Sequence, residues 1–178
     1  FQSKLIEFES LEAKQINHDV FSTLKERSEE ASKWLHEAKG YSCIREGYAN
    51  TTLMAIAPTK SSSFIHGAVS MGIEPIKSNY FIKDLAKSKT IYKNPFLEAE
   101  LEKYEMNNEK TWDSILKKDG SVQHLKFPTK KVFKSFIEIS PKEIILQAAQ
   151  RQKFIDQSQS LNLMIHPSVK AKDINKLY

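Results

Sequence analysis

A run of hydroxyl-bearing residues that follows a proline is the part of the sequence best suited to chemistry. It reads Pro58, Thr59, Lys60, Ser61 and Ser62. Hydroxyl groups, an ammonium group and the free N–H groups at a helix start are donors that bind anions such as phosphate. We therefore expect an anion site at these five residues. The alternative is an ordinary strand–turn–helix junction with a hydroxyl-rich cap, because serine-rich turns are common, and the run alone leaves both interpretations open.

The flanking residues predict the elements that would position this run. Residues 51–57 are mostly apolar, and a short apolar run bounded by turn formers is typical of a strand buried on both faces. Pro58 should end that strand because proline has no N–H for a ladder. Apolar residues then recur at helical spacing, which places the start of a helix among the serines. These residues are Phe64, Ile65, Ala68 and Val69.

Helices dominate the prediction for the rest of the chain. A long helix is expected from Ser10 to Lys39, with Ser10 as its N-cap and Gly40 as its left-handed end. Its apolar residues recur every three or four positions and should face a core. They are Ile16, Val20, Phe21, Leu24, Ala31, Leu35 and Ala38. Shorter helices are predicted at 95–107, 109–118, 129–152 (broken at Ser140) and 170–178, and a second buried strand at 161–165.

Composition and charge bound the class of protein. The chain has 178 residues, 40% of them hydrophobic, and a net charge of +5, which suits one globular domain with a core. No apolar run is long enough to cross a bilayer and no signal peptide is recognisable, so we expect a cytoplasmic protein that does not enter a membrane. The basic residues are scattered without interleaved aromatic rings, so a basic nucleic-acid-associated protein is the weaker alternative.

The other reactive side chains form no comparable motif. Cys43 is the only cysteine, which excludes an internal disulfide and a cysteine-based metal cluster. The five histidines are too dispersed for a short metal motif, so no metal site is predicted. Glu74 could serve as a catalytic carboxylate, but no partner lies nearby in the sequence. A structural hydrogen-bonding role for Glu74 is therefore preferred.

Five segments of the sequence occur in a recognisable order. They are Asn50-Thr-Thr-Leu-Met-Ala-Ile-Ala-Pro-Thr-Lys-Ser-Ser-Ser63, Gly72-Ile-Glu-Pro75 with Ser78-Asn79, Gly120-Ser-Val-Gln123, Glu138-Ile-Ser140, and Phe154-Ile-Asp-Gln-Ser-Gln-Ser-Leu-Asn162. In this combination the chain resembles the large catalytic subunit of class I ribonucleotide reductases, in the C-terminal part of its catalytic barrel. The resemblance runs from about Phe8 to Tyr178. The short connector 41–49 departs from many members and resembles the compact form of phage and some microbial enzymes.

The resemblance implies a fold and a role for the hydroxyl-rich run. The fold would be α/β, with residues 1–178 forming a fragment of a ten-stranded barrel that is mostly helical here and contributes the buried strands 51–57 and 161–165. The complete enzyme reduces ribonucleoside diphosphates to deoxyribonucleotides by thiyl-radical chemistry. In the family the run from Pro58 to Ser62 binds the substrate phosphates, and Lys60 stands where relatives vary.

The resemblance also implies what this chain does not contain. The catalytic cysteines, asparagine and glutamate of the family would lie upstream of Phe1, and the radical-relaying tyrosine pair beyond Tyr178. Cys43 matches none of these roles, so no catalytic residue is assigned and the isolated piece, incomplete at both ends, is expected to be inactive.

The partners implied are the upstream part of the large subunit, a second large subunit, and a small subunit carrying a metal and a tyrosyl radical. Thioredoxin or glutaredoxin would be the reductant. A non-catalytic nucleotide-phosphate-binding relic or regulator remains the alternative to part of an enzyme. An adjacent reading frame with the missing motifs would favour the enzyme.

Overall fold

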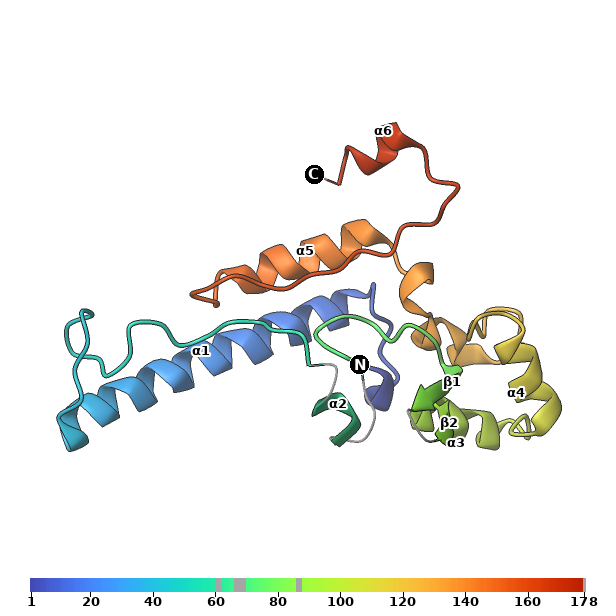
Figure 1. Ribbon diagram of the computed structural model, residues 1–178, viewed down its shortest axis with the longest axis horizontal. Coiled ribbons are helices and arrows are strands. Elements are labelled where there is room, and N and C mark those ends of the chain that lie inside the picture. Colours follow the sequence, from blue (N-terminus) through green and yellow to red (C-terminus); the bar gives the residue numbers. More distant parts are fainter. Residues whose placement is uncertain (60–61, 66–69, 86–87, 178) are drawn as a thin grey trace.

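The computed structural model describes residues 1–59, 62–65, 70–85 and 88–177, with the backbone alone at 64, 83–85 and 88–90. Helices dominate this part of the chain (Figure 1). The α-helices are α1 (Leu11–Lys39), α2 (Ser62–Ile65), α3 (Pro95–Lys103), α4 (Glu109–Leu116), α5 (Pro141–Gln152) and α6 (Ala171–Ile174). Strands β1 (Tyr80–Leu85) and β2 (Ser88–Lys93) form an antiparallel hairpin. Short 3-10 helices occupy Gln2–Lys4, Pro128–Phe133 and Phe136–Glu138.

Helix α1 has the ends that its sequence predicts. Ser10 Oγ accepts a hydrogen bond from the Ala13 amide at 3.0 Å, which satisfies one of the free donors of the first turn. Gly40 ends the helix at φ 70°, and its N–H donates to His36 O. A left-handed glycine at this position is the usual helix stop because it lacks a Cβ. Both predicted boundaries of the long helix are confirmed.

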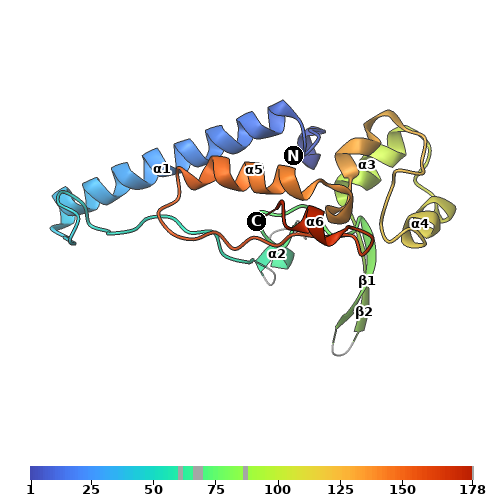
Figure 2. The same cartoon turned by 90° about the horizontal axis from the view of Figure 1, so that it is seen from above.

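The predicted core-facing stripe of α1 is largely wrong. Of the seven apolar residues assigned to it only Phe21 is buried, whereas Val20 and Leu24 are 47% and 48% exposed. The buried face instead follows Ala13, Asn17 and Phe21, spaced four residues apart. This face packs along α5, which lies beside α1 in both ribbon views (Figures 1 and 2). The contact includes polar groups, because Asn17 Nδ2 donates to Gln147 O at 3.1 Å.

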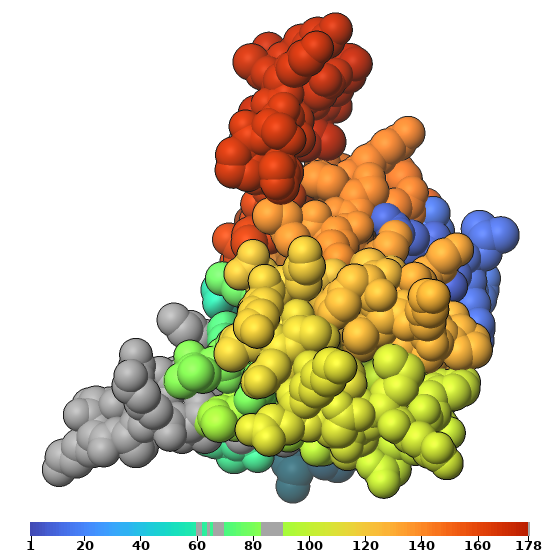
Figure 3. Space-filling view, turned by 90° about the vertical axis from the view of Figure 1, so that its right-hand side faces the viewer, coloured from blue at the N-terminus to red at the C-terminus, as the bar shows by residue number. Residues whose placement is uncertain are grey.

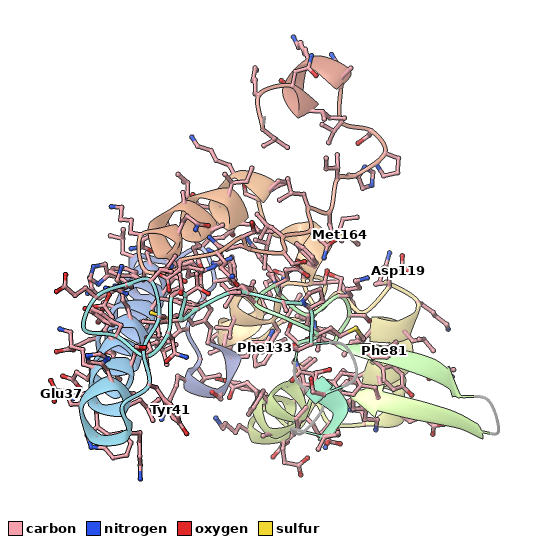
Figure 4. All side chains as sticks on the ribbon, turned by 60° about the vertical axis from the view of Figure 1, so that its left-hand side comes forward. Glu37, Tyr41, Phe81, Asp119, Phe133 and Met164 are labelled. Atoms are coloured by element: carbon pink, nitrogen blue, oxygen red, sulfur yellow. The ribbon has the colours of Figure 1, made fainter. Side chains whose placement is uncertain are left out.

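The main core lies at the other end of the molecule from the C-terminal end of α1. It is built from α3, α4 and the segment that follows them, with residues Leu97, Leu101, Trp112, Ile115, Val122, Phe127, Val132 and Phe133. Figure 4 shows Phe133 inside this body and Glu37 and Tyr41 at the far end of α1. The β1–β2 hairpin projects from the same body (Figure 2). A second, smaller cluster of Phe136, Ile139 and Ile144 lies beside it.

The two segments predicted as buried strands, 51–57 and 161–165, are extended but are not strands of a sheet. Residues 53–56 pair in parallel with residues 157–160 through one bridge, Ile56 with Gln159. Three backbone hydrogen bonds hold the pair, the shortest from Ser160 N to Ile56 O at 2.9 Å. The segment 51–57 is not buried on both faces, because Thr51, Thr52, Ala55 and Ala57 are exposed, and within the described residues it has one pairing neighbour. The pairing also falls before 161–165, so that prediction is corrected as well.

The region 129–152 differs from its predicted helix in its first half. Two 3-10 helices precede α5, which begins at Pro141 as the break at Ser140 predicts. The Ser140 side chain makes no capping hydrogen bond, and the carboxylate of Glu143 instead pairs with Lys14 at 2.7 Å. The last helix is shorter than predicted, since α6 spans Ala171–Ile174. Its segment stands away from the rest of the molecule (Figure 3).

Candidate phosphate-binding site

Three of the five predicted site residues lie in the described part of the chain. Pro58, Thr59 and Ser62 are all exposed, and Lys60 and Ser61 lie outside the described residues. The Thr59 amide donates to Met71 O at 3.0 Å, and the Thr59 carbonyl accepts from Ser63 N at 2.9 Å. The backbone of Thr59 is thus fixed at both ends. Its hydroxyl has no partner among the described residues, so it is available to a ligand.

A cavity of about 150 Å³ lies beside Pro58. It is lined by Ala57 and Pro58, by Met71, Gly72, Ile73 and Glu74, by Lys77, and by Ser160 and Asn162. All of these residues except Met71 and Lys77 come from three of the five sequence segments that carry the resemblance. Segments separated by up to about a hundred residues therefore converge on one small pocket next to the hydroxyl-rich run.

Glu74 holds two of these segments together. Its Oε1 accepts hydrogen bonds from Asn162 N at 2.6 Å and from Asn162 Nδ2 at 2.9 Å. The Ser70 hydroxyl donates to the backbone carbonyl of Glu74. These bonds are the kind of structural contact that the sequence analysis prefers for Glu74, although its partner Asn162 lies 88 residues away in the chain.

Asp156 fixes the extended segment that leads into the site, and sequence reasoning did not single it out. Its Oδ2 accepts from Leu53 N at 2.7 Å and from Met54 N at 3.2 Å. Gln157 Nε2 adds a weaker bond to Thr52 Oγ1 at 3.3 Å. The only signal in the sequence is an acidic residue directly before a segment that must pair with another. Asp156 thus accepts hydrogen bonds from backbone amides that a neighbouring strand would satisfy in a sheet.

The remaining motif residues build the frame beneath the site. Asn79 is fully buried, and its Nδ2 donates to Gly120 O at 2.9 Å and to Phe133 O at 2.7 Å. Ser121 Oγ donates to Glu138 Oε1 at 2.5 Å. These contacts join three of the sequence segments. The frame carries the segment 72–77, because Phe136 N donates to Ile76 O at 2.9 Å.

The charges around the cavity are mixed. Lys77 is exposed and contributes a positive charge, and Glu74 contributes a negative one. Arg151 is buried on α5; burial lowers its pKa to about 10, and the charge of Glu74 acts in the opposite direction.

Within the described residues no three His, Cys, Asp or Glu side chains gather in a way that could hold a metal ion. No helix in that part of the chain is both long and apolar enough to cross a membrane.

Comparison with known proteins defines the family. The family model of the ribonucleotide reductase barrel domain matches residues 41–178. The chain therefore belongs to the ribonucleotide reductase family, as part of its barrel domain, and the resemblance noted in the sequence is confirmed.

Individual relatives agree with this assignment. The ribonucleoside-diphosphate reductase large subunit of Invertebrate iridescent virus 3 is 37% identical, and the match covers 99% of this chain and 29% of the relative. The large subunit of Danio rerio is 35% identical, over 67% of this chain and 15% of its own length. A solved structure, the class Id ribonucleotide reductase alpha subunit of Actinobacillus ureae, superposes with a TM-score of 0.90 and 49% identity over 98% of this chain and 33% of its own. The chain spans a third or less of the length of these relatives.

Proposed function

We propose that this chain is part of the large subunit of a class I ribonucleoside-diphosphate reductase and that residues 58–62 bind the phosphates of the substrate. The observation that carries the proposal is the cavity at Pro58, on which three separate family segments converge. The 49% identity to a class I alpha subunit supports the same role. All of residues 1–178, including the part before the matched range, would then belong to the catalytic barrel.

The described donors suit a phosphate. The hydroxyl of Thr59 is exposed and unengaged among the described residues, and the Ser62 hydroxyl makes a long contact of 3.4 Å to Thr59 O. Both hydroxyls can rotate toward a phosphate oxygen. Lys77 adds an ammonium group at the cavity wall. The hydroxyls would donate hydrogen bonds to phosphate oxygens, and Lys77 would supply one positive charge.

The reaction itself would depend on other parts of the assembly. The proposal includes the upstream part of the large subunit, a second large subunit, and the small subunit with its metal and tyrosyl radical. Thioredoxin or glutaredoxin would supply the electrons. We assign no step of the radical chemistry to residues of this chain, which would bind and orient the substrate. The free thiol of Cys43 is compatible with the proposed cytoplasmic location.

The test is a double substitution, Ser61→Ala with Ser62→Ala, in the complete large subunit assayed with its small subunit. Removing two donors to a charged group should raise KM for the ribonucleoside diphosphate, at about 1.5–3 kcal/mol per lost bond. Ser22→Ala on α1, where the hydroxyl bonds to Asp19 O, is the matched control. Unchanged KM and kcat in the double variant would refute the phosphate assignment. If the complete assembly with the unsubstituted chain bound the nucleotide but did not reduce it, a regulatory role would be favoured instead.

A further inference from the structure

Arg151 is an unusual residue to find in the interior of this molecule. It is 2% exposed, and within the described residues no carboxylate lies within ion-pair distance of its guanidinium group. Its contacts are a hydrogen bond from Nε to Gln159 Oε1 at 2.7 Å and the ring of Phe21, whose centroid lies 5.9 Å away. Burying a guanidinium without a partner charge is unfavourable. We therefore ask which neighbouring side chain Arg151 holds in position.

Arg151 fixes the side chain of Gln159. Because arginine can only donate, the amide oxygen of Gln159 must be the atom that faces Arg151. The amide nitrogen then donates to Ala148 O at 2.9 Å and to Gln152 Oε1 at 2.7 Å. Both hydrogens and the oxygen of this side chain are engaged, all by residues of α5. Gln159 is therefore tied to α5 in one orientation.

Gln159 in turn lies beside the segment that leads into residues 58–62. It is the bridge partner of Ile56, and the next residue, Ser160, donates its N–H to Ile56 O at 2.9 Å. Ala57 and Pro58 follow Ile56 directly and line the cavity, as does Ser160. A continuous path of contacts leads from α1 through Arg151 and Gln159 to the wall of the site.

We propose that Arg151 is a positioning residue for substrate binding: by holding Gln159 it sets the place of the Ile56 bridge and hence of Pro58 and Thr59. This inference rests on the proposed function of the loop.

The experiment uses the complete large subunit with its small subunit and measures KM and kcat for a ribonucleoside diphosphate. In Arg151→Met we expect KM to rise by about tenfold, the size of one lost hydrogen bond to a charged group, with kcat changed by less than about twofold. Gln159→Leu should act in the same direction. The double variant should show less than the sum of the two effects, because both act through one contact. Arg151→Lys keeps the charge and should recover part of the affinity.

Controls separate positioning from general destabilisation. Arg27→Met removes an exposed arginine that pairs with Glu30 on the same helix and should leave KM unchanged. Leu101→Ala weakens the main core, away from the path, and should lower the melting temperature without raising KM. If Arg151→Met does not yield folded subunit, Arg151→Lys and Gln159→Asn carry the test, each with an expected rise in KM of about two- to fivefold, because each retains part of the contact.

The outcomes are distinct. An unchanged KM in the Arg151 and Gln159 variants overturns the inference, as does an equal rise in Leu101→Ala at a matched melting temperature. If Ser61→Ala with Ser62→Ala raises KM and the Arg151 variants do not, the proposed function stands and the positioning role falls. If none of these variants changes KM, the proposed phosphate site is refuted, and the positioning role that rests on it is refuted as well.

Discussion

Gly120 offers a sharp test of how closely the frame beneath the site is packed. It is buried and adopts φ +83°, a region that favours glycine. A Cβ at this position would lie 1.9 Å from Ser78 Oγ and 2.8 Å from the backbone nitrogen of Asn79. The second atom belongs to the backbone and cannot rotate away. Gly120→Ala should therefore disturb the contact that joins Asn79 to the 120–123 segment.

The expected loss can be built from two contributions. Left-handed backbone costs a non-glycine residue about 1–2 kcal/mol, and an inserted methyl group in a packed interior costs about 1–3 kcal/mol. Gly120→Ala should lower the free energy of unfolding by about 2–5 kcal/mol, the sum of these terms. For a chain of this length each kcal/mol lowers the melting temperature by about 2–4 °C.

Two other glycines separate these contributions. Gly47 has φ +76°, and a Cβ at this position would meet no atom within 4 Å, so Gly47→Ala should show the backbone cost alone. Gly72 has open space and no positive φ, so Gly72→Ala should be close to neutral. Thermal and urea unfolding of the three variants, side by side, provide the measurement. A loss in Gly120→Ala no larger than that in Gly47→Ala would refute the reasoning.

Two further predictions concern carboxylates. Asp156→Ala leaves the Leu53 and Met54 amides to water, so we expect a loss of about 1 kcal/mol in unfolding free energy and a raised KM, whereas Asp113→Ala, at an exposed helix position, should change neither. Hydrogen bonds from Lys103 and Thr129 lower the pKa of Glu100 against the effect of burial. The stability from Glu100 should then be present above pH 4.5, its ordinary value, and be lost as the pH falls through the lowered pKa of the folded state. The melting temperature of Glu100→Gln should therefore lie below that of the parent at about pH 7, and this difference should be smaller at about pH 3. A difference that does not change with pH would contradict this assignment.

Features encoded by neighbouring residues could be predicted from the sequence. The ends of α1 follow from Ser10 and Gly40, and the start of α5 follows from Pro141. In each case the physical cause lies within a few residues of the boundary. The role of Glu74 was also predictable in kind, although its partner Asn162 was not.

Features that depend on distant partners could not be predicted in the same way. The β1–β2 hairpin was missed because Ala86 and Lys87 carry none of the residue pairs that mark a tight turn. Its pairing is visible only in the register, where Ile82 faces Ile91 and Phe81 stacks on Tyr92 with ring centroids 4.8 Å apart. The predicted stripe on α1 is largely wrong because α5 covers a different face, where Asn17 bonds to Gln147 O and Gln150 Oε1. Helical periodicity does not show which face a neighbour will cover.

The extended segments 53–56 and 157–160 show how few contacts position the candidate site. Three backbone hydrogen bonds join them, and Asp156 and Gln159 supply the side-chain bonds that fix their register. A wide ladder would distribute this role over many backbone groups, so that no single side chain mattered much. With one bridge, the position of Pro58 depends on a small number of side chains. Substitutions at Asp156, Gln159 and Arg151 should therefore change substrate affinity clearly, even though Asp156 is exposed and Gln159 is only half-buried.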